Sequence, residues 1–259
     1  MFRASPYKLQ MFRQCPQQYK FCYIDKLAKI YRKPRPYLTM GQNVHDALRI
    51  FFAYLSTEER SEERLHEILR DCWRKNREGF KDEQEEREYG TKALNMLSLF
   101  CRNNDYKIDP IMVEDFYSAS INPGLEISGR IDRVDREKDG TIHVIDYKTG
   151  KEPRDVDIFL KEDIQLIAYS FIVNSQMPDR VFRASYLFLE SGRLLTIKPD
   201  DSLLSEGIKK IIDIVNEIKV EKYFRAKTGP LCRFCDFLEI CPEKDFLQPK
   251  QKEEIELPF

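Results

Sequence analysis

The stretch GRIDRVD at residues 129–135, followed by VIDYKTG at residues 144–150, decides the fold of this chain. Both stretches have the composition and alternation of strands, and the Lys138-Asp139-Gly140 sequence between them is typical of a hairpin turn. Successive side chains of a strand point to opposite faces of the sheet. Asp146 and Lys148 are therefore expected to project together from one face, at the end of an apolar strand.

Asp132 lies across this predicted hairpin and reaches Asp146 and Lys148 if the register of the strands allows it. Two adjacent carboxylates repel each other, and a divalent cation between them relieves the repulsion. Hard oxygen ligands suit Mg²⁺ or Mn²⁺, and a nearby lysine can orient water or stabilise charge that develops on a phosphate. From the residues alone a plainer interpretation stays open, because Asp-x-Lys pairs on solvated strands are common and contribute little energy. Glu114, in the preceding strand, is either a supporting acid or an exposed strand residue.

The remaining pattern predicts helices on both sides of a strand-rich centre. Helical spacing and capping residues indicate helices at about 5–15, 16–23, 44–55, 61–73, 84–102, 157–176 and 201–223. Strand patterns cover 111–119, 125–135, 141–148, 183–190 and 193–198. This order indicates an α/β fold, a mixed β-sheet core flanked by helices. We divide it into an N-terminal helical region at 1–110, a core at 111–225 and a cysteine-rich tail at 226–259.

Three cysteines of the tail, Cys232, Cys235 and Cys241, have the spacing C-x₂-C-x₅-C-P. Thiolates this close together indicate a metal site, which needs a fourth ligand. Cys15, near the other end of the chain, is the natural candidate. Four cysteines fit zinc and an iron–sulfur cluster equally well. The other cysteines are expected to be small buried hydrophobic residues, namely Cys22, Cys72 and Cys101.

Composition limits the partners of the chain. Its 259 residues include 43 lysines and arginines and 44 aspartates and glutamates, a formal net charge of −1. A nucleic acid would therefore meet a local basic patch and not a general positive field. No apolar run of about 18 residues indicates a transmembrane helix, and the N-terminal MFRASPYKLQ lacks the apolar core of a signal peptide. We therefore expect a cytoplasmic protein without a disulfide framework and without a membrane partner.

The acidic hairpin resembles motifs II and III of the RecB-like branch of the PD-(D/E)xK nuclease superfamily. This branch includes the RecB and AddAB nuclease domains and the CRISPR-associated nucleases of spacer acquisition. The resemblance implies a restriction-endonuclease-like core in which Asp132 and Asp146 bind the metal ion. It also implies that the carbonyl of Tyr147 is a further ligand and that Lys148 is catalytic. The acid at position 146 is Asp and not Glu, which this branch commonly allows.

Two more motifs carry the same resemblance. Gly41 and His45 match a G-x-x-x-H pattern in an early helix, where the family has an additional metal ligand. A lone helical histidine is otherwise more often a packing or surface residue. Gln165 and Tyr169, in QLIAY, match the family's Q-x-x-x-Y motif and share a helix face. The implied role is to position the substrate backbone and Lys148, and the alternative is an ordinary polar pair on an exposed helix.

The resemblance also bears on the four cysteines. Many nucleases of this branch hold a [4Fe–4S] cluster with one cysteine before the nuclease core and three after it. The Cys-Pro pairs at Cys15 and Cys241 match as well. The resemblance therefore favours [4Fe–4S] over Zn²⁺ at Cys15, Cys232, Cys235 and Cys241, with a structural role.

The implied activity is that of a Mg²⁺- or Mn²⁺-dependent deoxyribonuclease. We expect an exonuclease on single-stranded or frayed DNA ends, which hydrolyses phosphodiester bonds in DNA repair, recombination or CRISPR adaptation, with a helicase or CRISPR-adaptation protein as partner. The alternative is a non-catalytic iron–sulfur DNA-binding subunit of a helicase–nuclease complex. Three tyrosines are candidates to stack on bases of a single strand, namely Tyr31, Tyr37 and Tyr147.

Overall fold

The computed structural model describes residues 1–247, so residues 248–259, the end of the predicted cysteine-rich tail, lie outside the described part. The chain forms two compact units. One comprises Met1–Tyr7 and Pro34–Asn216, and the other comprises Lys8–Lys33 and the described residues from Glu217 to Leu247. The division at residues 110 and 225 stays a prediction.

The first unit is built on a mixed six-stranded sheet with the order β1-β3-β4-β5-β6, in which β2 pairs with β3 outside this path. Two of its pairings are parallel, β1 with β3 and β4 with β5, and the others are antiparallel. The predicted α/β class, a mixed sheet flanked by helices, is confirmed. The strands are β1 (Phe2–Ala4), β2 (Met112–Asn122), β3 (Leu125–Arg136), β4 (Ile142–Lys148), β5 (Val181–Phe188) and β6 (Arg193–Ile197).

The β3–β4 hairpin has the predicted turn. Gly140 has a φ of +86°, a left-handed conformation that glycine adopts without strain. Val134 pairs with Val144 and Arg133 pairs with Ile145. One further step along this register brings Asp132 beside Asp146.

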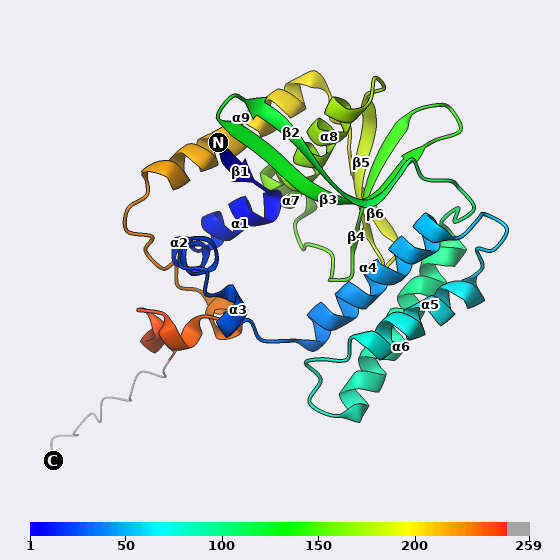
Figure 1. Cartoon of the computed structure of the whole chain (residues 1–259), viewed down its shortest axis with the longest axis horizontal. Coiled ribbons are helices and arrows are strands. Elements are labelled where there is room, and N and C mark those ends of the chain that lie inside the picture. Colours follow the sequence, from blue (N-terminus) through cyan, green and yellow to red (C-terminus); the bar gives the residue numbers. More distant parts are fainter. Residues whose placement is uncertain (248–259) are drawn as a thin grey trace, which may run out of the picture. The chain divides into compact units, whose positions relative to one another are not determined.

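Three helices cover one face of the sheet: α4 (Pro36–Tyr54), α5 (Glu62–Lys75) and α6 (Glu83–Asn103). Figure 1 shows them side by side, and each packs on the other two. Ser61 and Asp82 cap the second and third of these helices, each accepting a hydrogen bond from the backbone three residues on. Their apolar faces form one core with Ile145 and Tyr147 of β4 and with the end of β5. This core fixes the strand that carries the acidic hairpin.

The predicted helix at 157–176 is two helices, α7 (Val156–Glu162) and α8 (Gln165–Gln176). Asp163 breaks it, with an extended backbone at φ −67° and ψ 136°. Its carboxylate accepts hydrogen bonds from the Leu166 N–H (2.9 Å) and from the Tyr186 hydroxyl (2.6 Å). The single-helix prediction was therefore wrong, because a buried tertiary partner holds Asp163 out of the helix. The break makes Gln165 the first residue of α8, which packs against β2, β3, β4 and β5. The helix α9 (Asp201–Val220) follows β6.

The second unit consists of short elements. Phe12 and Tyr19 pack edge to face at 5.4 Å, and the Phe224 ring stacks on Tyr19 at 6.2 Å. The predicted helix through Tyr23 is a short α-helix that continues as a π-helical turn. Within residues 1–247, no helix is both long and apolar enough to cross a membrane. The remaining elements are α1 (Pro6–Gln14), which begins before this unit, α2 (Pro16–Tyr19), the π-turn Lys20–Ile24, α3 (Ala28–Tyr31) and 3₁₀ turns at Pro230–Phe234, Leu238–Ile240 and Lys244–Leu247.

Candidate active site

Asp132 is held where the β3–β4 ladder ends. Its Oδ2 accepts a hydrogen bond from the Tyr147 N–H at 2.8 Å, and its Oδ1 lies 3.3 Å from Nδ1 of His45 on α4. The side chain is buried, at 9% exposure. The structure thus brings the early-helix histidine to the first acid of the hairpin, although 87 positions separate them in the chain.

Gln165 joins the second acid to the lysine. Its amide nitrogen donates to Asp146 Oδ1 (2.7 Å), and its amide oxygen accepts from Lys148 Nζ (3.0 Å). The amide orientation is fixed chemically, because a carboxylate only accepts and an ammonium only donates. The same nitrogen lies 3.0 Å from the hydroxyl of Tyr169, one helical turn further on. The four residues therefore form one connected group on the α8 side of the sheet.

Gly129 makes room for this group. A Cβ at position 129 would lie 2.5 Å from Cε1 of Tyr169, closer than two non-bonded carbon atoms can approach. The absence of a side chain on β3 therefore lets the Tyr169 ring pack directly on the strand.

Charge is concentrated in this buried place. Burial raises the pKa of Asp146 to about 6, and Lys148, at 2.7 Å from its Oδ2, opposes that rise. Burial alone would lower the pKa of His45, but the carboxylates of Asp132, Asp146 and Glu114 more than offset it and raise the pKa to about 9. In this arrangement Lys148 faces Asp146, and the His45 imidazolium faces Asp132.

Glu114 is a buried acid beside His45, so the alternative of an exposed strand residue is wrong. Its side chain is 5% exposed and lies 3.2 Å from Arg130 and 3.8 Å from Arg49. Its φ of 39° is rare for a residue with a side chain and turns the carboxylate inward from an irregular strand. Burial, and then Asp132, raises its pKa.

Two neighbours of the site carried little or no signal in the sequence. Lys148 Nζ lies 4.6 Å from the centre of the Tyr186 ring, a cation–π distance. The Tyr186 hydroxyl donates to Asp163 and lies 3.4 Å from the amide oxygen of Gln165. The sequence carried one signal for Asp163: an aspartate just before a helix is a typical capping residue, and here it accepts from the Leu166 N–H. Tyr186 had none, because only the parallel pairing of β4 with β5 places it there.

The prediction that the Tyr147 ring stacks on a base was wrong. The ring is buried on the opposite face of β4, 5.9 Å from the ring of Phe100. Its hydroxyl lies 3.5 Å from a guanidinium nitrogen of Arg133. Its backbone N–H reaches Asp132, and its ring meets the site only through an edge-to-face contact with the His45 ring at 6.2 Å.

The donor set fits a hard divalent cation. Within residues 1–247, no three His, Cys, Asp or Glu side chains are already arranged as a metal-binding group. Asp146 Oδ2, however, is buried and accepts no hydrogen bond; Lys148 is at ion-pair distance without hydrogen-bond alignment. Asp132 Oδ1 faces His45, whose ring offers a ligand nitrogen once neutral. Two carboxylates and one imidazole are therefore available in one small volume.

The second unit brings Cys15 towards the three tail cysteines. Burial, and then Cys15 and Cys241, raises the pKa of the Cys235 thiol. Burial, and then Cys15 and Cys232, raises the pKa of the Cys241 thiol. Two sulfurs also accept backbone hydrogen bonds, Cys15 from the Lys227 N–H (3.5 Å) and Cys232 from the Gly229 N–H (3.3 Å). The donor set fits a thiolate-bound metal group, and the assignment of such a group stays a prediction.

The remaining cysteines differ from one another. Cys72 and Cys101 are buried as predicted, whereas Cys22 is half-buried. Burial raises the pKa of Cys22 to about 11, with smaller contributions from Asp236 and Cys235. Cys22 therefore lies near the tail cysteines without being part of the predicted set.

Comparison with known proteins shows the superfamily of the chain. The family model of the PD-(D/E)XK nuclease superfamily matches residues 3–242, so the chain belongs to that superfamily. One component of an ATP-dependent helicase/deoxyribonuclease from Streptococcus mutans serotype c is 28% identical over 147 residues, which are 52% of this chain and 13% of that protein. The corresponding component from Streptococcus pyogenes serotype M6 is 32% identical over 104 residues, 37% of this chain and 10% of that protein. The chain thus spans about an eighth of the length of these relatives, or less.

A solved structure supports the fold. A protein of Eubacterium rectale that has been assigned as an exonuclease superposes with a TM-score of 0.50 at 14% identity, covering 89% of this chain and 86% of that one. At this identity the similarity establishes the restriction-endonuclease-like fold and nothing finer.

Proposed function

We propose that this chain is a Mg²⁺- or Mn²⁺-dependent deoxyribonuclease, acting as an exonuclease on single-stranded or frayed DNA ends. The observation that carries the proposal is the hydrogen-bonded group in which Gln165 connects Asp146 to Lys148. A lysine on a solvated strand would be free to move, whereas this ammonium is fixed beside a carboxylate that accepts no hydrogen bond at its second oxygen.

The residues that would hold the cation are His45, Asp132, Asp146 and the carbonyl of Tyr147. A divalent cation bound there supplies Lewis-acid polarisation of the scissile phosphate and a lower pKa for a bound water. Lys148 orients the attacking water and stabilises the negative charge that grows on the phosphate oxygens. Gln165 and Tyr169 hold Lys148 in place and position the substrate backbone. His45 must lose its proton before its ring nitrogen can act as a ligand.

The choice of DNA as substrate is supported by the relatives, which are named as components of helicase/deoxyribonucleases. On this basis we propose a helicase-bearing partner and a role in DNA repair, recombination or CRISPR adaptation.

The test of the proposed activity is digestion of 5′-labelled linear, 3′-labelled linear and circular DNA with Mg²⁺, with Mn²⁺ and with EDTA. Loss of label from linear DNA with intact circles supports an exonuclease. Cleavage of circles would contradict it, and metal-independent binding without cleavage would favour a non-catalytic DNA-binding protein.

We also propose a structural [4Fe–4S] cluster at Cys15, Cys232, Cys235 and Cys241. The four thiols and the backbone N–H groups that point at two of their sulfurs support it. Protein purified without oxygen should be brown and contain iron and sulfide. The Cys15→Ser protein should lose both, whereas the matched variant Cys22→Ser should keep them. A colourless wild-type protein with one bound zinc would show that the four cysteines bind Zn²⁺ and not an iron–sulfur cluster.

A further inference from the structure

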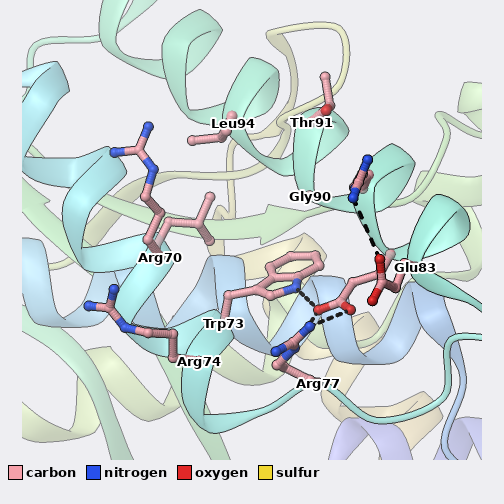
Figure 2. Close-up of a pocket in the computed structure, with 11 residues that line it drawn as sticks. Arg70, Trp73, Arg74, Arg77, Glu83, Gly90, Thr91 and Leu94 are labelled. Carbon is pink, nitrogen blue, oxygen red and sulfur yellow. Dashed lines mark hydrogen bonds and ion pairs between the residues drawn. The ribbon is translucent and has the colours of Figure 1, made fainter.

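A pocket of 670 Å³ lies between α5 and α6, on elements that contribute no residue to the acidic site. Figure 2 shows Arg70, Trp73 and Arg74 on one side and Gly90 and Leu94 of α6 on the other. No motif in the sequence pointed to it.

The floor of the pocket is an aromatic ring held in a fixed orientation. The indole nitrogen of Trp73 donates to Glu86 at 3.0 Å, and the ring stacks on Phe80 with centres 5.7 Å apart and planes 20° apart. Gly90 of α6 has no side chain, and a Cβ added there would be in van der Waals contact with the ring, 3.8 Å from Cζ2 of Trp73. The ring lines the pocket together with Leu69 and Leu94, which complete the apolar lining.

The rim of the pocket carries more positive than negative charge. Four arginines and two glutamates line it. Arg77 forms a bidentate ion pair with Glu86, with N···O distances of 2.7 and 2.8 Å, and a guanidinium nitrogen of Arg87 lies 3.5 Å from the Glu83 carboxylate. Arg70 is exposed and has no ion pair or hydrogen bond within the described part of the chain, so its guanidinium is available to a ligand. The chain as a whole has a net charge of −1, so this excess of arginine is local.

We propose that this pocket binds one nucleotide of a DNA single strand, with its base on Trp73 and its phosphate at Arg70. Aromatic rings stack on any base without sequence preference, and a guanidinium matches a phosphate in charge and geometry. An aromatic ring and two leucines beside a free guanidinium fit a base with its phosphate better than an acidic peptide, whose carboxylates need no aromatic partner. This proposal rests on the proposed action on DNA; the pocket would hold the strand outside the acidic site and does not itself take part in hydrolysis.

Trp73 is the only tryptophan of the chain, so its fluorescence reports on this pocket alone. The experiment titrates the 259-residue chain with an oligothymidylate in EDTA, where the proposed hydrolysis does not occur, and follows the quenching of Trp73 fluorescence. Labelled-oligonucleotide anisotropy measures the affinity in parallel. We expect saturable quenching in the wild type. We expect the same quenching in the Asp146→Asn protein, so failure of hydrolysis and failure of this pocket are distinguishable.

Two variants test the pocket, and one serves as a matched control. Gly90→Leu places a bulky side chain against the ring within the pocket and should weaken binding about 5-fold to 150-fold, the range for losing one stacked base. Arg70→Ala should weaken binding and lower the slope of log affinity against log salt by about 0.7, as for one phosphate contact of a single strand. Arg64→Ala should change neither, because Arg64 lies on the same helix outside the pocket and pairs with Glu67.

The outcomes are decisive in both directions. Unquenched Trp73 at saturating DNA, or equal affinity and salt dependence in wild type and Arg70→Ala, would overturn the proposal. Quenching by polyglutamate and not by DNA would assign the pocket to an acidic peptide. If circular dichroism shows that the Gly90→Leu protein is unfolded, the Arg70→Ala protein, changed at an exposed position, tests the proposal by itself.

Discussion

Replacing Gln165 with methionine tests whether the connected group on α8 sets the rate of hydrolysis. The methionine keeps the volume of the side chain and removes both ends of its amide. Asp146 then loses its donor at Oδ1, and Lys148 loses its acceptor at 3.0 Å. Neither residue changes, so any effect comes from their positions.

The expected size follows from the bonds that are lost. Hydrogen bonds to charged groups contribute about 1.5–3 kcal/mol. If that stabilisation is lost mainly from the transition state, the rate falls roughly 10- to 150-fold. Single-turnover digestion of labelled DNA with Mn²⁺ measures this rate apart from product release. The affinity for DNA in EDTA should fall less than the rate, because several groups would hold the substrate backbone, whereas Gln165 joins Asp146 directly to Lys148.

The matched control is Gln176→Ala at the other end of the same helix. That side chain is exposed and donates to the Ser118 carbonyl at 3.1 Å, outside the acidic group. It should keep the wild-type rate. An undiminished rate in Gln165→Met, or an equal fall in Gln176→Ala, would refute the positioning role of Gln165.

Three further predictions concern stability, each measured as the free energy of unfolding in urea. Gly129→Ala should destabilise the protein by about 1–3 kcal/mol, because its Cβ would lie 2.5 Å from the Tyr169 ring; an unchanged value would contradict this packing. Arg60→Met should cost at least about 3 kcal/mol, because it removes the donor from the buried carbonyl of residue 52 and from the partly buried carbonyls of residues 55 and 108; a cost below about 1 kcal/mol would contradict this. Burial lowers the pKa of His143 below its ordinary 6.5, so its contribution is complete above pH 6.5 and is lost as the unfolded state takes up a proton at lower pH. The stability difference between wild type and His143→Gln should therefore shrink on acidification, and a constant difference would contradict that assignment.

The acidic hairpin could be predicted because its information is local. Strand alternation and the Asp-Gly turn place Asp146 and Lys148 on one face, and helical spacing places Gln165 and Tyr169 on another. The structure brings these two pairs together through α8.

The parts that could not be predicted depend on tertiary contacts. The break at Asp163 requires the hydroxyl of Tyr186, on a strand that follows later in the chain. The strand β1 has three residues, too few for any periodicity, and exists because it pairs with Leu125–Ile127. The Tyr147 ring was misassigned although strand alternation places it on the face opposite Asp146 and Lys148, where it packs into the core formed with the three helices.

The most direct test of the central claim compares wild-type and Asp146→Asn protein in digestion of linear DNA. The substitution keeps the size of the side chain and removes the charge that a cation requires. We predict that the wild type degrades DNA with Mg²⁺ or Mn²⁺, that EDTA stops it, and that the variant is inactive with either metal while still folded. Full activity of the variant, or wild-type activity in EDTA, would contradict a metal-dependent nuclease centred on Asp132, Asp146 and Lys148.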